Sequence, residues 1–224
     1  MKVIILGDGL LGNEIHLQTS WDLASRKTSG FNIEGNFNKL QDYDVIVNCI
    51  AHTDTYSKNK ELHWKVNCEF LDCLIDYCNL HKKKLVHIST DYVYTHSERN
   101  ASEDSVPVHL QSWYGYTKLL GDGLVQLRCK DYLICRLSHK PYPFPYENAW
   151  TDIRTNCDFV NIIANLVVSL IIKKARGVFN VGTEEKSIYD LVKNTKDVDK
   201  SYKPTHVPAD TTMDLTKLNR FLRS

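Results

Sequence analysis

A glycine-rich turn directly after an apolar run constrains the fold of this chain more than any other feature. Residues 2–6 read Lys-Val-Ile-Ile-Leu, and residues 7–12 read Gly-Asp-Gly-Leu-Leu-Gly. The G-x-G-x-x-G pattern is weak alone, but between a strand and a helix it is typical of a dinucleotide-binding βαβ unit. The sequence therefore predicts a cofactor site at its first turn.

Each position of this turn has a physical task. We expect Gly7 to permit the tight turn, Gly9 to let the backbone approach a pyrophosphate, and Gly12 to let the helix pack close to the sheet. Leu10 and Leu11 open the helix, whose N-terminal N–H groups face the negative charge. All five residues are assigned to the cofactor site.

Apolar runs alternate with amphipathic stretches along the rest of the chain. Continuous apolarity is typical of parallel strands that are covered on both faces. The predicted strands are residues 2–6, 20–24, 44–49, 85–89, 132–136 and 177–182. The predicted helices are residues 10–18, 60–81, 112–127 and 157–173. This alternation predicts an α/β fold with a doubly wound, Rossmann-like parallel sheet.

A proline-rich segment suggests where the chain changes role. Residues 141–146 read Pro-Tyr-Pro-Phe-Pro-Tyr, which can continue neither a helix nor a central strand. We therefore expect a dinucleotide-binding domain over 1–138 and a small substrate-binding region over 139–224. Residues 177–182 are expected to return to the sheet.

Composition excludes several classes of protein. The 224 residues are 42% hydrophobic and 25% charged, which rules out wholesale disorder. The net charge of +1 lacks the basic excess of a nucleic-acid binder, and no apolar run is long enough to span a bilayer. The seven cysteines form no CxxC motif, and the chain shows no signal-peptide pattern. We therefore expect a cytoplasmic protein whose thiols are reduced. The nine histidines show no metal-ligand spacing, so no metal is expected.

The end of the second predicted strand bears on the choice of cofactor. An acidic residue there would bind the ribose 2′-hydroxyl of NAD, but this chain has Ser25, Arg26 and Lys27. A hydroxyl and two cations suit a 2′-phosphate, so NADP is expected. NAD becomes the expectation if the strand ends earlier, because Asp22 would then take the ribose.

A Tyr-x-x-x-Lys pair follows the fourth predicted strand. Tyr114 and Lys118 lie on one face of a helix, where the ammonium is expected to lower the pKa of the phenol. Thr90, next to Ser89 at the end of that strand, can donate a hydrogen bond to a substrate carbonyl. These residues form a candidate proton-transfer site.

At this point the chain resembles the extended short-chain dehydrogenase/reductase superfamily, and within it the dTDP-4-dehydrorhamnose reductases and their shorter sugar-nucleotide-binding relatives. The matching stretches are Val47–Thr53, Trp64–Asn67, Ile88–Tyr94, Glu103–Pro107, Tyr114–Lys118, Gly177–Gly182 and Met213–Leu218. The chain is shorter than typical members after the fifth strand, and Gly121-Asp122 stands where they often have Gly-Glu.

The resemblance implies an NAD(P)H-dependent reductase of a keto-sugar nucleotide, of the 4-keto-6-deoxyhexose type. In this reading Thr90 polarises the ketone, Tyr114 protonates the alkoxide, and Lys118 holds the cofactor ribose. The resemblance also places Cys49, Ile50, Ala51 and Asn67 beside the cofactor. His52, Thr90, Arg136 and His139 are candidate substrate contacts, although an ion pair at the strand end is the favoured alternative for Arg136.

Two alternatives stay open. A sugar-nucleotide 4,6-dehydratase or epimerase would have the same fold, but relatives that dehydrate carry Thr-Asp-Glu where this chain has Thr90-Asp91-Tyr92. A non-catalytic, cofactor-binding subunit would explain the shortened substrate region. A nucleotide-sugar partner is expected, and a homodimer is compatible with the sequence.

Overall fold

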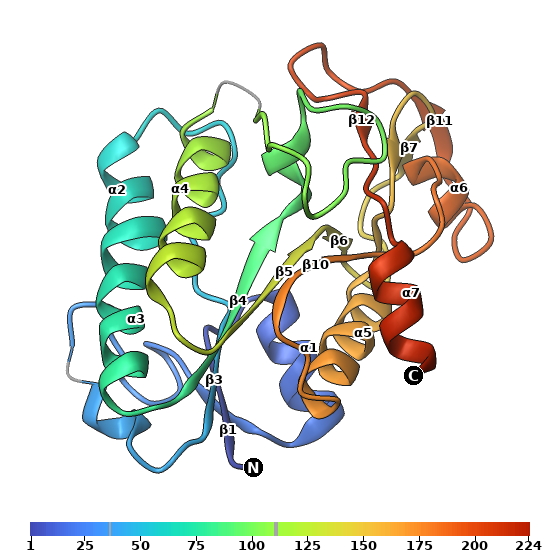
Figure 1. Ribbon diagram of the computed structural model, residues 1–224. Helices are drawn as coiled ribbons and strands as arrows, with labels where there is room; N and C mark the ends of the chain where they lie inside the picture. The colour runs from blue at the N-terminus through green and yellow to red at the C-terminus, as the bar shows by residue number, and fades with distance from the viewer. Residues whose placement is uncertain (36, 110–111) are drawn as a thin grey trace.

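The computed structural model describes residues 1–35, 37–109 and 112–224, and Figure 1 shows a central sheet with helices on both faces. The strands of the main sheet are β1 (Val3–Leu6), β2 (Asp22–Ala24), β3 (Val45–Asn48), β4 (Lys84–Thr90), β5 (Tyr132–Leu137) and β10 (Gly177–Val181). The longer helices are α1 (Leu10–Thr19), α3 (Phe70–Leu80), α4 (Trp113–Arg128), α5 (Val160–Ile172) and α7 (Thr216–Arg223). The doubly wound α/β fold is confirmed, and all six predicted strands lie within two residues of their predicted bounds.

All six strands of the main sheet run parallel, in the order β10-β5-β4-β3-β1-β2. The order reverses between β1 and β3, because the chain moves outward from β1 to β2 and then returns to the other side. In sheets of this type ligands bind outside the carboxyl ends of the strands at that reversal. The fold therefore places a site where the glycine-rich turn leaves β1.

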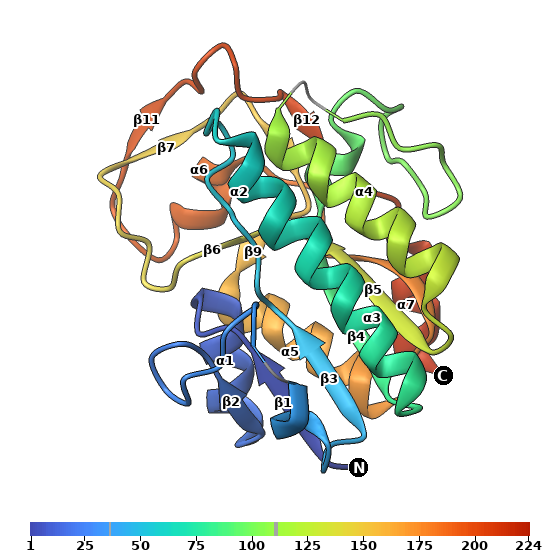
Figure 2. The same ribbon diagram turned by 90° about the vertical axis from the view of Figure 1, so that its left-hand side faces the viewer.

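Each face of the sheet is covered by its own apolar layer. On one face, α1 and α5 pack with α7 in a cluster that includes Ile15, Val167 and Leu218. On the other face, α3 and α4 contribute Leu74 and Val125 to a second cluster. Figure 2 shows α3 and α4 in front of the sheet and α1 and α5 behind it. Burial on both faces explains why these strands read as continuous apolar runs.

The predicted helix over 60–81 contains an irregular turn. The structure has α2 (Lys60–Trp64), a π-helical turn (Lys65–Glu69) and then α3, with no break in the helical path. Asn67 and Cys68 lie in this π-helical turn, and both are buried. Such turns occur frequently at functional sites.

The C-terminal part is richer in strands than predicted. Short parallel pairs join β6 (His139–Lys140) to β9 (Asp158–Phe159), β7 (Asn148–Trp150) to β11 (Asp199–Ser201), and β8 (Arg154–Thr155) to β12 (Asp210–Thr211). The proline-rich segment 141–146 therefore lies between β6 and β7. The helix predicted from 157 begins at Val160, because residues 158–159 pair with β6. The short α6 (Ile188–Val192) completes this part.

Within the described residues, every helix is too short or too polar to cross a membrane. The same part of the chain holds no cluster of three metal-binding side chains.

Candidate active site

A cavity of about 270 Å³ lies at the carboxyl ends of β1, β3, β4 and β5. Its walls come from segments that are far apart in the sequence. The lining residues are Gly9, Leu11, Gly12, Cys49, Ala51, Thr53, Ile88, Ser89, Thr90, Tyr114, Lys118, Leu137, Ser138 and His139. The glycine-rich turn and the Tyr-x-x-x-Lys pair thus share one cleft.

The glycines of the turn differ in what surrounds them. Gly7 has φ +102°, and a Cβ on Gly12 would lie 2.0 Å from the Gly7 carbonyl oxygen. A Cβ on Gly9 would meet nothing within 4 Å. Gly7 and Gly12 are therefore required by the fold itself, whereas Gly9 leaves open space at the start of α1. Gly9 is the N-cap of α1 and supplies no side-chain hydrogen bond to the first turn.

A carboxylate from the glycine-rich turn lies beside the end of β2, which the sequence pattern did not predict. Ser25 is buried and donates a hydrogen bond of 2.9 Å to Asp8 Oδ2, so its hydroxyl is engaged inside the turn. Arg26 and Lys27 are exposed beside it. Asp22 is the first residue of β2 and accepts a bond from Tyr43, so it is not at the carboxyl end. Asp8 of the glycine-rich turn thus places a carboxylate beside this strand end, where the sequence indicated only a hydroxyl and two cations.

Asn67 ties the segment after β3 to α4. Its Oδ1 accepts the backbone N–H of His52 at 2.9 Å, and its Nδ2 donates to Thr117 Oγ1 at 3.0 Å. The side chain is 3% exposed and does not line the cleft. Asn67 thus holds the loop that carries Cys49 and Ala51, which line the cavity, while its own side chain lies outside that cavity.

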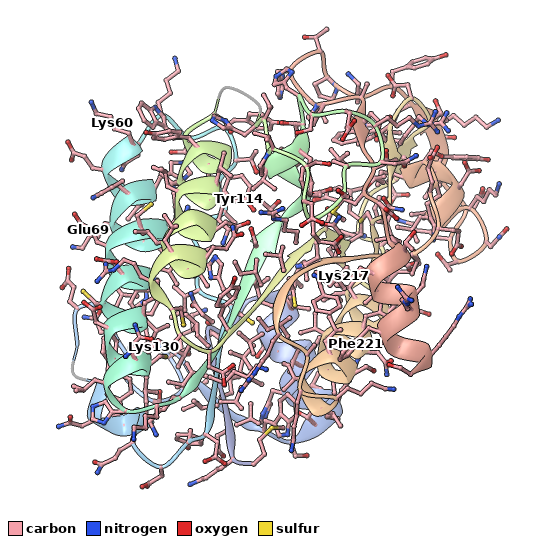
Figure 3. All side chains as sticks on the ribbon, viewed as in Figure 1. Lys60, Glu69, Tyr114, Lys130, Lys217 and Phe221 are labelled. Carbon is pink, nitrogen blue, oxygen red and sulfur yellow. The ribbon has the colours of Figure 1, made fainter. Side chains whose placement is uncertain are left out.

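Thr90, Tyr114 and Lys118 meet on the wall of the cleft, and Figure 3 labels Tyr114 on the side of α4 that faces the sheet. The Tyr114 hydroxyl is hydrogen-bonded to the Thr90 side chain. Thr90 is positioned by the end of β4, where its Oγ1 also accepts the N–H of Tyr92 at 3.2 Å. A phenol and a hydroxyl in contact can together approach one carbonyl oxygen.

The ionisation of the pair differs from the sequence-based expectation. Burial raises the pKa of Tyr114 to about 12, against a lowering contribution from the hydrogen bond to Thr90. Burial lowers the pKa of Lys118 to about 8, although the Asp122 carboxylate opposes that shift. Lys118 Nζ donates to the Ile88 carbonyl at 2.7 Å. The expectation that Lys118 gives the phenol a lowered pKa is therefore wrong for this structure, because desolvation of Tyr114 is the largest effect and raises its pKa.

Arg136 lies away from the cleft. It is 1% exposed, its Nε donates to Asp122 Oδ2 at 2.8 Å, and its Nη1 contacts the Tyr94 hydroxyl. The assignment of Arg136 as a substrate contact is wrong, since these partners hold the guanidinium inside the core. The alternative of an ion pair at the strand end is the arrangement observed.

Of the two histidines expected to contact the substrate, only one lines the cavity. His139 lines the cleft from β6, and burial lowers its pKa to about 4, which makes it neutral. The His52 ring packs edge-on against His63 at 4.4 Å between centroids and does not line the cavity.

Several predicted cofactor residues also lie outside this cavity. They are Gly7, Leu10, Ser25, Arg26, Lys27, Ile50 and Asn67.

The structure adds cleft residues that the motifs did not single out. Thr53, Ile88, Leu137 and Ser138 line the cavity. The buried Ser89 hydroxyl finds no hydrogen-bond partner within the part of the chain that the structure describes. The Ser-Thr sequence at the end of β4 was the available signal for Ser89. The remaining lining residues could be identified only from the structure, in which the ends of the strands come together.

Comparison with known proteins gives a consistent family. The family described as RmlD substrate binding domain matches residues 1–140. A dTDP-4-dehydrorhamnose reductase of Salmonella typhimurium is 33% identical over 97 residues, which are 42% of this chain and 32% of that protein. A probable low-salt glycan biosynthesis reductase of Haloferax volcanii is 29% identical over 137 residues, which are 59% of this chain and 45% of that protein. The matches thus span less than half the length of these relatives.

Solved structures show the same fold over nearly the whole chain. A hypothetical dTDP-4-dehydrorhamnose reductase from Sulfolobus tokodaii superimposes with a TM-score of 0.79 at 22% identity, covering 98% of this chain and 94% of that one. The dTDP-4-dehydrorhamnose reductase from Bacillus anthracis in complex with NADP superimposes with a TM-score of 0.82 at 21% identity, covering 98% of this chain and 93% of that one. UDP-glucuronic acid 4-epimerase from Bacillus cereus in complex with NAD superimposes with a TM-score of 0.78 at 20% identity, covering 100% of this chain and 90% of that one.

Proposed function

The chain belongs to the RmlD substrate binding domain family of extended short-chain dehydrogenase/reductases, and from this we propose that it is an NAD(P)H-dependent reductase of a keto-sugar nucleotide. One observation carries the proposal. The triad of Thr90, Tyr114 and Lys118 lines the same cleft as Gly9 and Gly12. A group that donates a proton therefore lies beside a turn suited to a dinucleotide.

The residues of the cleft fit a nicotinamide dinucleotide. The open space at Gly9 admits a pyrophosphate close to the backbone, and the first turn of α1 offers N–H groups without a side-chain cap. Gly9, Leu11 and Gly12 would hold the pyrophosphate. Cys49 and Ala51 would form one wall, and Lys118 would reach the ribose. When bound, the reduced cofactor supplies a hydride to the carbonyl carbon.

Two side chains of the protein would bind the ketone oxygen of the substrate. Thr90 and Tyr114 both donate hydrogen bonds to the ketone oxygen, and this stabilises the charge that develops on it. The pKa of about 12 keeps the Tyr114 phenol protonated at neutral pH. A reductase needs such a group, because its tyrosine must enter the cycle carrying the proton that the alkoxide will take.

We further propose that residues 1–138 hold the dinucleotide and that residues 139–224 hold the nucleotide sugar. His139, at the start of the latter region, lines the cavity together with Thr90 and Tyr114. Its imidazole is neutral, so it can exchange hydrogen bonds with sugar hydroxyls without a charge of its own. A 6-deoxy-4-keto sugar is the substrate class that the family resemblance suggests.

NADP is the proposed cofactor, and the structure supplies both a favourable and an opposing charge. Arg26 and Lys27 are exposed at the end of β2, where a 2′-phosphate would lie. Asp8 stands near them, held by Ser25. The cations favour NADPH, whereas the carboxylate opposes it, so we expect NADH to be accepted as well.

The test is turnover with NADPH on a panel of 4-keto sugar nucleotides. Wild-type protein should oxidise NADPH with at least one of them. Tyr114→Phe should lose about 10²- to 10⁴-fold in kcat while binding NADPH as before, because the substitution removes only the hydroxyl. Turnover of Tyr114→Phe at the wild-type rate would contradict the mechanism. Elimination of water from a sugar nucleotide, without net oxidation of NADPH, would favour the dehydratase instead.

A further inference from the structure

A buried histidine lies directly behind Lys118. His87 is in the middle of β4 and is 1% exposed. Its Nε2 is 3.3 Å from Lys118 Nζ and 3.9 Å from Asp122 Oδ1, and its Nδ1 is 3.4 Å from Asn48 Nδ2. Both ring nitrogens thus face polar side chains in the core, where each contact must match donors with acceptors.

The orientation of Asn48 decides which nitrogen of His87 carries a proton. The Ile50 N–H donates to Asn48 Oδ1 at 3.1 Å, which fixes the amide oxygen on the side of the loop. Asn48 Nδ2 therefore faces His87 Nδ1 and can only donate to it. His87 is neutral, because burial and the neighbouring Lys118 hold its pKa well below the usual value. A neutral imidazole has one ring proton, so Nδ1 accepts and the proton lies on Nε2.

This tautomer has a consequence for Lys118. An Nε2–H cannot accept a hydrogen bond from an ammonium group, but it can donate to the lone pair of an amine. Asp122 Oδ1 lies 3.9 Å from the same nitrogen, too far for a hydrogen bond, so the nearest partner of the Nε2–H is Lys118 Nζ. We propose that His87 is a positioning residue that carries its proton on Nε2 and thereby selectively stabilises the uncharged amine of Lys118.

The other groups around Lys118 act in the opposite direction or are uncharged. Asp122 on α4 favours the ammonium. Cys49 after β3 and Cys68 in the π-helical turn are neutral thiols, because burial raises their pKa to about 12 and about 11. Tyr114, one turn earlier on α4, is a neutral phenol. Beyond Asp122, Arg136 on β5 takes up the second oxygen of that carboxylate. The pKa of Lys118 is nevertheless lowered, to about 8, with burial as the main cause.

A lysine that changes charge near neutrality can restore the proton of Tyr114. This step rests on the proposed function. After Tyr114 has given its proton to the alkoxide, an N–H bond of the ammonium breaks and an O–H bond forms on the phenolate. The lower pKa of the ammonium makes this transfer favourable. The amine that remains accepts the Nε2–H of His87, until a proton from solvent recharges it.

Nuclear magnetic resonance tests the proposal without any turnover. Long-range ¹H–¹⁵N spectra of the histidine rings should show His87 protonated at Nε2 in the wild-type protein. A titration of the Lys118 ε-carbon should have its midpoint near 8, as the lowered pKa requires. A ring proton on Nδ1 of His87 would overturn the proposal, whatever the protein turns over. Failure to reduce any keto sugar would instead contradict the proposed function alone.

Asn48→Asp is the decisive variant, because it keeps the shape and replaces the donor that faces Nδ1 with an acceptor. His87 should move its proton to Nδ1, and its Nε2 should then accept from the Lys118 ammonium. We expect the Lys118 midpoint to rise by about one pH unit. The matched control is the same substitution in a His87→Leu background, where most of this rise should disappear. An equal rise in both backgrounds would show that the new carboxylate acts directly on Lys118, and would refute the role of His87.

Discussion

The buried ion pair between Arg136 and Asp122 should contribute far more to folding than an exposed pair of the same kind. The two side chains are 2% and 0% exposed, and they are 2.8 Å apart. Arg136→Met removes the cation and leaves a carboxylate in the core without its partner. Breaking a buried pair in this way destabilises a protein by roughly 3–5 kcal/mol. In a chain of this length that corresponds to a fall of about 10 °C in the thermal midpoint.

Arg176 and Asp131 provide a matched control within the same protein. They are also an arginine–aspartate pair, at 2.9 Å, but their side chains are 73% and 34% exposed. Arg176→Met should change the free energy of unfolding by at most about 1 kcal/mol, because water screens the pair. Urea denaturation of both variants measures the difference. A loss in Arg136→Met no larger than in Arg176→Met would refute the reasoning.

A double variant separates loss of the pair from loss of packing. Arg136→Met combined with Asp122→Leu removes both charges and keeps apolar volume. It should recover at least half of the stability lost in Arg136→Met, since no charge remains buried alone.

Three further predictions concern ligands. Gly9→Ala should fold normally and weaken NADPH binding in a fluorescence titration. Gly12→Ala should lower the thermal midpoint, because its Cβ would meet the Gly7 carbonyl oxygen, and equal effects of the two variants on folding would contradict this difference. Arg26→Ala should lower the ratio of kcat/KM for NADPH to that for NADH by about 10- to 100-fold, the value of one charged hydrogen bond, and an unchanged ratio would exclude Arg26 from the cofactor site. Amide hydrogen exchange across 139–151 should slow with saturating sugar nucleotide, and unchanged exchange would make this segment a structural connection only.

The parts of the fold that the sequence predicted are those with strong local signals. The apolar runs of β1, β3 and β4 are buried on both faces, so each is visible without knowledge of its neighbours. The glycine-rich turn is likewise a local pattern. The three short strand pairs of the C-terminal part escaped prediction, because two- or three-residue strands show no periodicity and β7 pairs with residues about fifty positions away.

The errors at the candidate site have a similar cause. Arg136 and Asp122 lie on different elements, and only the packing of α4 on β5 brings them together. The motif located Tyr114 and Lys118 but could not give their pKa values, which depend on the depth of burial. Asp8 reaches Ser25 across the turn, a contact that no pattern in either segment predicts.

The position of α5 affects the order in which the protein can form during synthesis. α1, which carries the glycine-rich turn at its start, packs against α5, and the Gln18 side chain donates to the Asn161 carbonyl. A ribosome extends the chain from its N-terminus, so α1 emerges about 140 residues before the helix that covers it. Until then the apolar side of α1, including Ile15, lacks its main partner. The nascent turn should therefore be unable to hold a dinucleotide firmly, and ligand should stabilise the chain only after α5 has left the exit tunnel.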